Sequence, residues 1–268
     1  AEAKKMGLEI LPPDINESLE DFTLIRVERP KIRFGLTAIK NLSGNAINSI
    51  IEKRKEGGYF KNIQNFLEII PASDLNKKSL EALIKCGALD SFNERRMLLI
   101  NIEELLRYIK DLNKNNNTSQ IGLFESFKAL APLNLIQSEP ASKKEKLSWE
   151  KELLGLYTSE HPTSEYQEIM EKRSLLIAKV KPALVGQKTS VGGLISEIKK
   201  HVTKTGKLML FTKIEDWANK IEVVVFPDLL EKNPDMWIED KMVIVSGRVD
   251  NRDGNLKIIC ESAKEFII

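Results

Sequence analysis

Cysteine and histidine are nearly absent from this chain of 268 residues. The two cysteines, Cys86 and Cys260, lie in apolar stretches, so we expect no disulfide framework and a reducing compartment, the cytoplasm. The two histidines, His161 and His201, stand apart, which excludes a zinc site built from clustered cysteine and histidine ligands. No apolar run approaches the roughly 20 residues that a membrane span needs, and no secretory signal is visible.

Catalytic motifs are missing as well. The sequence contains no glycine-rich phosphate loop, no nucleophile elbow and no nucleophile–histidine pair. Two acidic pairs, at residues 215–216 and 239–240, lie near expected strand ends. Neighbouring residues on a strand point to opposite faces, so neither pair gathers carboxylates for a two-metal site. We therefore expect a binding protein with no catalytic residue, no metal site and no cofactor of its own.

Positive charge is concentrated in one stretch. Residues 26–110 contain 16 lysines and arginines against 10 acidic residues, whereas residues 111–182 and 183–268 are balanced and residues 1–25 are acidic. The formal net charge of the whole chain is only +2. A local excess of this kind is typical of a surface that meets a phosphate backbone, although it also occurs on surfaces without a ligand.

The spacing of apolar residues predicts a helical first part and a strand-rich last part. Within residues 26–112, a tight turn containing a glycine twice separates two helices, at residues 41–44 and 86–88, which predicts tandem helix-hairpin-helix motifs. Residues 129–182 are predicted to be a helical connector. Residues 183–268 read as five strands with one short helix between the third and fourth, the order of an OB-fold barrel. The expected class is α+β with several domains.

The two turns are the first candidate site. In a helix-hairpin-helix motif the backbone N–H groups of the turn point at a DNA phosphate, which requires small residues such as Ser43, Gly44 and Gly87. We predict that these residues bind duplex DNA together with the basic residues around them, Lys40, Lys77, Lys78, Lys85, Arg95 and Arg96. The prediction requires both turns to be exposed. The alternative is that the glycines only cap helices.

A short peptide after a polar linker is the second candidate site. Residues 113–119 are too polar to form a core of their own, and Gln120, Ile121, Leu123 and Phe124 follow directly, within the segment 113–128. Adjacent apolar residues after such a linker suit a pocket on another protein, with the glutamine amide setting the register. The alternative is that Leu123 and Phe124 pack beneath the following helix.

The barrel supplies the third candidate site. OB-fold surfaces combine aromatic stacking with basic groups. The candidates for single-strand DNA binding on its strands and loops are Lys199, Lys204, Lys207, Phe211, Lys213, Trp217, Arg248 and Arg252. The alternative is that Phe211 and Trp217 belong to the core of a domain without net charge.

Four segments resemble the C-terminal part of the bacterial replicative DNA polymerase III alpha-subunit family. They are IRFGLTAIK at residues 32–40, LEALIKCGALDSF at 80–92, ELLGLYTSEHP at 152–162 and the segment 214–227, in the order that the family has. The resemblance implies that residues 1–25 end the fingers region and that the tandem hairpins hold duplex DNA. It also implies that the barrel handles the single-stranded template and that the sliding clamp binds Gln120, Ile121, Leu123 and Phe124. The first turn differs, because residues 41–43 read Asn-Leu-Ser where the family usually has Gly-hydrophobic-Gly.

The resemblance also concerns the parent protein. It implies a DNA-directed DNA polymerase that uses magnesium and whose palm lies outside this chain, so that the fragment by itself is expected to be inactive. Other subunits of the polymerase III holoenzyme are expected partners, and a membrane is not. The alternative is a scaffold that binds replisome proteins and touches no nucleic acid. A nuclease ranks behind both, because no acidic residues converge.

Overall fold

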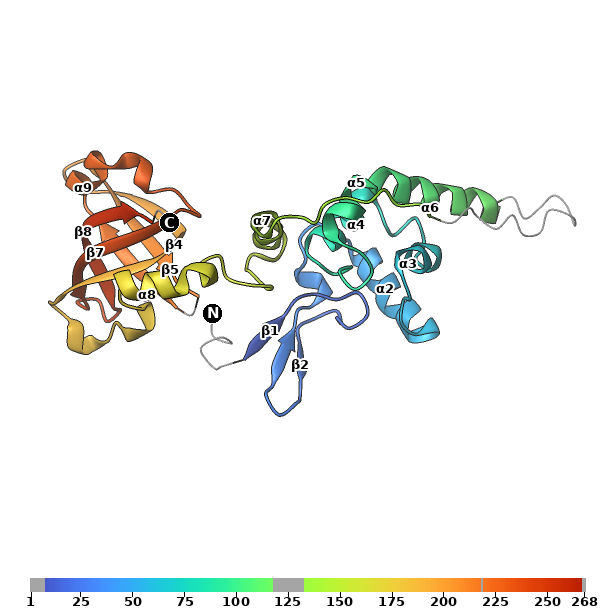
Figure 1. The fold of residues 1–268 in the computed structure, drawn as a ribbon, viewed down its shortest axis with the longest axis horizontal. Coiled ribbons are helices and arrows are strands. Elements are labelled where there is room, and N and C mark those ends of the chain that lie inside the picture. The colour runs from blue at the N-terminus through green and yellow to red at the C-terminus, as the bar shows by residue number, and fades with distance from the viewer. Residues whose placement is uncertain (1–7, 118–132, 218, 267–268) are drawn as a thin grey trace, which may run out of the picture. The chain divides into compact units, whose positions relative to one another are not determined.

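The computed structural model describes residues 8–117, 133–217 and 219–266 (Figure 1). These residues form two compact units, which divide between Ser159 and Glu160. The first unit consists of a small sheet and several helices, and the second is built on a barrel. Within the described residues, no helix has both the length and the apolar character to cross a lipid bilayer.

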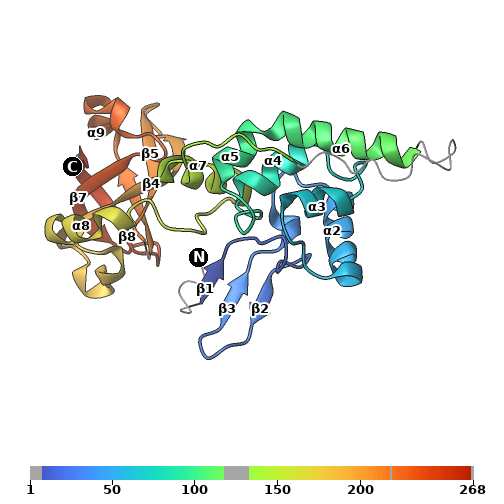
Figure 2. The ribbon, with the colours of Figure 1, turned by 45° about the vertical axis from the view of Figure 1, so that its right-hand side comes forward.

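A three-stranded sheet begins the first unit and extends from its helices (Figure 2). Strand β1 (Glu9–Leu11) pairs parallel to β3 (Lys31–Arg33), and β2 (Thr23–Ile25) pairs antiparallel to β3. The alternation of residues 22–27 and 32–34 on either side of Pro30 predicts a hairpin, and strands β2 and β3 form it. A 3-10 helix, η1 (Leu36–Ala38), then leads into the first turn.

Five helices follow and pack around one core: α2 (Gly44–Gly57), α3 (Ile63–Ile69), α4 (Lys77–Lys85), α5 (Arg95–Ile100) and α6 (Ile102–Asn117). Apolar side chains with at most 1% exposure form its centre: Phe34, Ile50, Phe66, Leu83 and Leu105. The first turn joins η1 to α2 and the second joins α4 to α5. Both predicted helix-hairpin-helix arrangements are therefore present.

The apolar spacing predicts one helix from residue 94 to residue 110, but the structure interrupts this helix at Asn101. The buried Asn101 amide donates to the carbonyls of Met97 at 2.7 Å and Ile136 at 2.9 Å, and its oxygen accepts from the Ile136 N–H at 2.9 Å. The break thereby fastens the extended segment before α7 (Lys143–Leu154) to the core. A capping box at Ser142 starts α7, and Gly155 in a left-handed conformation ends it.

The second unit is a closed five-stranded barrel with the strand order β4-β5-β6-β8-β7. Its strands are β4 (Lys188–Val202), β5 (Leu208–Glu215), β6 (Lys220–Val225), β7 (Met242–Asp250) and β8 (Lys257–Glu265). Helix α9 (Pro227–Lys232) lies between β6 and β7, where the sequence predicts it. Branched aliphatic side chains with no exposure fill the interior: Val191, Ile214, Val223, Val245 and Ile258. The predicted OB-fold is confirmed.

Shorter helices surround the barrel strands. Residues before β4 form η2 (Ser164–Tyr166), α8 (Gln167–Arg173), η3 (Ile177–Lys179) and η4 (Pro182–Leu184), and η5 (Pro234–Met236) precedes β7. Bridges from Leu175 to Val191 and from Val185 to Val249 tie this region to the strands. The chain from residue 160 onward therefore forms one unit with the barrel.

Candidate nucleic-acid interfaces

The first turn presents the N-terminus of α2. Asn41 has a φ of 69°, a left-handed conformation that asparagine adopts more readily than most residues. Ser43 caps the helix, because its Oγ accepts a hydrogen bond from the Ala46 N–H at 3.2 Å. Gly44 is exposed, and a Cβ built on it would meet nothing within 4 Å. An anion can therefore approach the backbone at the start of α2.

The N-terminus of α4 lies beside this turn. Ser79 Oγ donates to the Asn41 carbonyl and Ser43 Oγ donates to the Asp74 carbonyl, each at 3.4 Å. Asn76 caps α4 by accepting a hydrogen bond from the Ser79 N–H at 2.9 Å. Two helix N-termini, each the positive end of a helix dipole, thus meet on one surface.

The charges around these N-termini are mostly positive. Neither helix has an acidic residue in its first turn, and Lys77 and Lys78 are the first two residues of α4. Cations at a helix N-terminus are unfavourable, so a bound anion would relieve the repulsion. Lys77 pairs with Glu103 at 2.5 Å, whereas Lys40 and Lys78 form no ion pair with any residue that the structure describes. The Asp74 carboxylate accepts hydrogen bonds from two serines.

The second turn is covered by protein, so the prediction that both turns are exposed is wrong. Gly87 has a φ of 86°, and the N–H groups of Gly87 and Ala88 donate to the carbonyls of Ile84 at 3.1 Å and Leu83 at 3.0 Å. This is the Schellman pattern of a helix C-cap. A Cβ on the buried Gly87 would lie 2.3 Å from a guanidinium nitrogen of Arg95. At this glycine, the capping alternative is the correct one.

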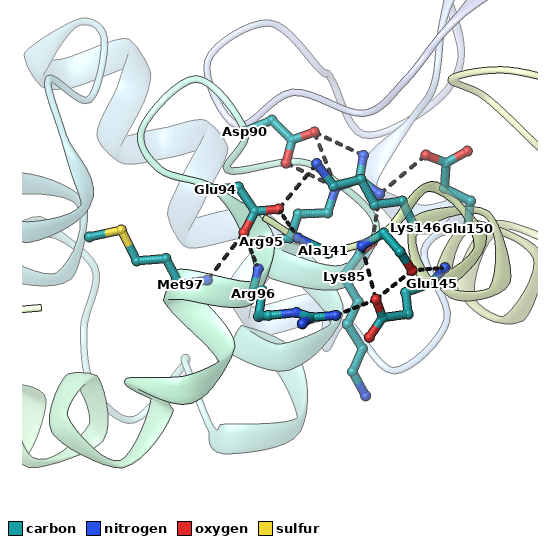
Figure 3. A network of polar contacts seen from close by, with 11 residues as sticks. Lys85, Asp90, Glu94, Arg95, Arg96, Met97, Ala141, Glu145, Lys146 and Glu150 are labelled. Carbon is teal, nitrogen blue, oxygen red and sulfur yellow. Dashed lines mark hydrogen bonds and ion pairs between the residues drawn. The ribbon is translucent and has the colours of Figure 1, made fainter. Parts of the chain in front are cut away.

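Arg95 binds protein groups in place of a phosphate (Figure 3). Its guanidinium donates to Asp90 at 2.8 Å, to Glu150 of α7 at 3.2 Å and to the Lys85 carbonyl at 3.1 Å. Its side chain is 4% exposed and that of Glu150 is fully buried. Burial lowers the pKa of Arg95, but the two carboxylates outweigh burial and raise it, so the arginine stays charged. The structure therefore removes Arg95 from the predicted DNA ligands.

Glu150 also holds the chain that leaves α7. One of its oxygens accepts hydrogen bonds from the N–H groups of Thr158 at 2.9 Å and Ser159 at 3.0 Å, and from Ser159 Oγ at 3.1 Å. The other oxygen binds Arg95. A buried carboxylate with this many donors stabilises one arrangement of α7 over the second turn.

Arg96 and Lys85 border the same covered region. Figure 3 shows the Arg96 guanidinium directed at Glu145 of α7, with which it forms an ion pair. The Lys85 ammonium has no ion pair among the described residues, although the Lys85 carbonyl is bound by Arg95. Lys85 remains available to a phosphate, whereas Arg96 would first have to leave Glu145.

Phe211 lies on the outer face of the barrel, because its neighbours Leu210 and Thr212 are buried. It is directly opposite Lys199 of β4 and Val224 of β6, so these three side chains form a row across three strands. Phe211 is half-buried and outside the barrel core, as is Trp217 in the turn after β5. The alternative that places both aromatics in the core is wrong.

Most of the predicted basic residues of the barrel have acidic partners. Lys199 and Lys213 share Glu197, at 3.1 Å and 2.5 Å. The remaining pairs are Lys207 with Asp228 at 3.8 Å and Glu231 at 3.5 Å, Arg248 with Glu261 at 3.0 Å, and Arg252 with Asp250 at 2.9 Å. Exposed pairs of this kind contribute little stability, so a phosphate can compete for the cations. Lys204 is exposed and has no ion pair among the described residues.

Sequence reasoning missed two aromatic side chains beside Phe211. The His201 ring meets the Phe211 ring edge-on, with centroids 5.9 Å apart. Phe226 follows β6 in an extended conformation and is 45% exposed. Two residues beyond Val224, it falls on the same face of the sheet as Phe211. The alternation of inward-facing and outward-facing residues along β6 is the sequence signal that could have indicated the position of Phe226.

The structure leaves the predicted clamp-binding peptide untested, because Gln120, Ile121, Leu123 and Phe124 lie outside the described residues. Among the residues that the structure does describe, no three or more histidine, cysteine or acidic side chains are grouped so as to hold a metal ion.

Family models match both candidate interfaces. A model described as a helix-hairpin-helix motif matches residues 7–99, and one described as an OB-fold nucleic acid binding domain matches residues 189–266. The DNA polymerase III subunit alpha of Thermus aquaticus is 32% identical over 265 residues, covering 97% of this chain and 21% of the relative. Those of Saccharopolyspora erythraea and Bacillus subtilis are each 33% identical, covering 98% of this chain and 23% of the relative.

The chain belongs to the DNA polymerase III alpha-subunit family. It spans about a fifth of the length of these curated alpha-subunit relatives. Among solved structures, the asparaginyl-tRNA synthetase of Pyrococcus horikoshii matches with a TM-score of 0.30 and 23% identity, over 35% of this chain and 23% of that one. The resemblance to the alpha-subunit family is confirmed over almost the whole chain.

The barrel of this alpha-subunit family member contains a buried carboxylate that predicts a pH effect. Burial raises the pKa of Glu215, but His161, 3.4 Å away, and Lys220 outweigh it and lower the pKa to about 2. Because the folded pKa lies below the usual 4.5, the carboxylate stabilises the fold above about pH 4.5 and loses this effect as the pH falls toward 2. The full effect is about 3 kcal/mol.

We expect Glu215→Gln to flatten the acid dependence of barrel stability. Urea unfolding at about pH 6 and about pH 3, followed by Trp217 and Trp237 fluorescence in a Trp149→Phe background, measures it. The variant should be less stable than the parent at the higher pH, and the difference in stability should be much smaller at the lower pH. An equal loss of stability in both proteins on acidification would contradict this role of Glu215.

Proposed function

We propose that this chain is the DNA- and clamp-binding part of a replicative DNA polymerase. The parent would be a cytoplasmic DNA-directed DNA polymerase whose palm and magnesium ions lie outside this chain, so the fragment would not polymerise. The observation that carries the proposal is the pair of neighbouring helix N-termini: neither α2 nor α4 has an acidic residue in its first turn, α2 is open at Gly44, and α4 begins with Lys77 and Lys78. The family membership supports it.

Duplex DNA would bind through its backbone. A phosphate at the start of α2 would accept hydrogen bonds from the N–H groups near Gly44, while Lys40 and Lys78 contact the phosphates on either side. The nine residues of α4 span about 13 Å, so Lys85 at its far end could reach a later phosphate. Contacts of this kind do not read sequence and weaken steeply with salt.

The single-stranded template would lie across the outer face of β4, β5 and β6. Bases would stack on Phe211 and Phe226, and Lys199, Lys213 and Lys204 would contact the phosphates. Every base can stack on an aromatic ring, so a site of this kind can bind a template of any sequence. The duplex and the single strand would thus be held by different units of the same chain.

Fluorescence anisotropy with labelled duplex and labelled single strand, each at two salt concentrations, tests this function. We expect both DNAs to bind at low salt and both affinities to fall as salt rises. The rival function, a scaffold that binds only replisome proteins, predicts no binding of either DNA at low salt. That result would overturn the proposal.

Clamp binding would depend on the peptide Gln120, Ile121, Leu123 and Phe124. Its apolar pair would fill a pocket on the sliding clamp, and tethering to a closed ring would raise the local concentration of the polymerase at the primer end. Processivity would then increase with no change in the chemistry. Other holoenzyme subunits would bind the same parent protein.

We expect Leu123→Ala with Phe124→Ala to abolish binding to the purified sliding clamp, because the two side chains supply the buried anchor. Isothermal titration with the clamp measures the affinity, and DNA binding should be unaffected. The matched control is Phe127→Ala with Leu130→Ala, which removes the same residue types a few positions further along the chain. Clamp affinity that survives the first pair, or is lost equally with the control, would contradict the assignment.

A further inference from the structure

The hairpin of β4 and β5 extends past the rest of the barrel. Strand β5 pairs with β6 only from Leu210 onward, and β4 pairs with β7 only up to Leu194. The pairs His201–Met209 and Val202–Leu208 therefore belong to a two-stranded arm with no third strand beside it. We call residues 199–211 the arm; the two pairs at its base, Lys199–Phe211 and Lys200–Leu210, still adjoin β6.

The tip of the arm is fixed by hydrogen bonds. The Thr203 N–H donates to the Lys207 carbonyl at 2.8 Å, and Thr203 Oγ1 accepts from the Lys207 N–H at 3.1 Å and donates to the Lys207 carbonyl at 3.0 Å. Gly206, with a φ of 79°, closes the turn. In the same turn, Lys207 pairs with Asp228 and Glu231 of α9. The arm is thus preorganised to hold its side chains in place.

The two faces of the arm carry different side chains. His201 lies on the face of Phe211, where the single strand is proposed to bind. Val202 and Leu208, which are direct register partners, share the opposite face and are 62% and 40% exposed. An exposed apolar pair at the end of a rigid arm is suited to make contact with a flat apolar surface.

The charge of the arm restricts what that surface can be. The arm contains no acidic residue, and its basic residues besides His201 are Lys199, Lys200, Lys204 and Lys207. Lys200 and Lys204 form no ion pair with a described residue, and the pairs of Lys199 and Lys207 are exposed and weak. The arm therefore favours a partner that combines a flat apolar face with a rim of negative charge. The end of a DNA duplex has this chemistry, since its terminal base pair is flanked by phosphates.

We propose that the arm is a wedge for a junction between single- and double-stranded DNA. Val202 and Leu208 stack on the terminal base pair, while the emerging single strand passes along the opposite face, over His201 and Phe211. The inference rests on the single-strand binding proposed above and adds the kind of DNA that the barrel selects. The lysines at the tip hold the phosphates on either side of the junction.

The variant Val202→Thr with Leu208→Thr tests the wedge, because threonine keeps the strand propensity and removes most of the apolar contact. Three DNAs are compared by anisotropy with the full chain: a single strand, a duplex closed by loops at both ends, and a duplex with that single strand as an overhang. We expect affinity for the junction to fall about five- to tenfold, the size of one stacking contact, and the other two affinities to stay unchanged.

The matched control is Val185→Thr with Leu24→Thr, which makes the same two replacements at exposed sites outside the arm, 45% and 50% accessible. It should bind all three DNAs as the unaltered chain does. A 2-aminopurine at the terminal base pair adds a direct readout: its fluorescence should change when the unaltered chain binds and not when the arm variant binds. Circular dichroism melting checks that both variants fold.

The outcomes separate this inference from the proposed function. Failure of the unaltered chain to bind single strand and duplex would refute the proposed function, and the wedge with it. If both DNAs bind but the arm variant weakens single strand and junction equally, the apolar pair belongs to the single-strand site and is no wedge. If the arm variant loses nothing, the pair has no DNA contact, as a protein-binding arm would predict.

Discussion

Replacing Lys40, Lys78 and Lys85 by glutamate is expected to weaken duplex binding at least about a hundredfold, because three attractive phosphate contacts become repulsive. The plot of log affinity against log salt should also lose about two to three units of slope. Anisotropy with a labelled duplex over a series of salt concentrations measures both quantities. Single-strand affinity should change much less, because the proposed single-strand site lies on the barrel.

The matched control reverses the same number of charges elsewhere on the first unit. Arg26 and Arg29, in the turn between β2 and β3, and Lys110 of α6 are all exposed. Changing these three residues to glutamate alters the net charge by the same amount. The comparison therefore separates the effect of charge position on duplex affinity from the effect of total charge. An equal loss in both triple variants would show that only the overall charge matters, and the helix N-termini would lose their assigned role.

Glu150→Ala is expected to destabilise the first unit by about 3–5 kcal/mol, the usual cost of leaving one partner of a buried ion pair alone. The change leaves Arg95 without one of its two carboxylates and frees the N–H groups of Thr158 and Ser159. Urea unfolding followed by Trp149 fluorescence measures the effect. The second turn and α7 should lose their hydrogen-exchange protection first.

Glu145→Ala is the matched control for this prediction, because it removes a carboxylate of α7 whose ion pair with Arg96 is partly exposed. Its cost should be about 1–2 kcal/mol, because Glu145 also completes the capping box at Ser142. A loss at Glu150 no greater than that at Glu145 would contradict the structural role given to the buried network. Duplex affinity should be retained by Glu150→Ala under conditions in which the variant is folded.

The elements that the sequence predicts correctly are those with strong local patterns. Alternation and turn residues indicate the β2–β3 hairpin, the five barrel strands and α9, and the apolar spacing indicates α2 and α4. Helix α3, with only seven residues, is too short to show a period and was not predicted. The break at Asn101 depends on its contacts with Ile136, 35 residues away, which no local pattern reveals.

The covered second turn could not be predicted for the same reason. Gly87 and Arg95 have the residue types that a phosphate site requires, and the local sequence does not separate that use from a helix cap. The choice between these two uses is decided by Glu150, which lies 55 residues after Arg95 in the sequence and is buried against the Arg95 side chain. The first turn shows the reverse case, because Asn41 and Ser43 replace the usual glycines yet form the turn and the cap.

The central claim is that the N-termini of α2 and α4 bind a phosphate of duplex DNA. The most direct test is the NMR titration of the ¹⁵N-labelled chain with duplex. The amide signals of Gly44, Asn45 and Lys78 should shift as duplex is added, and those of Gly87 and Ala88 should stay in place. Shifts confined to the second turn, or none at the first, would contradict the claim.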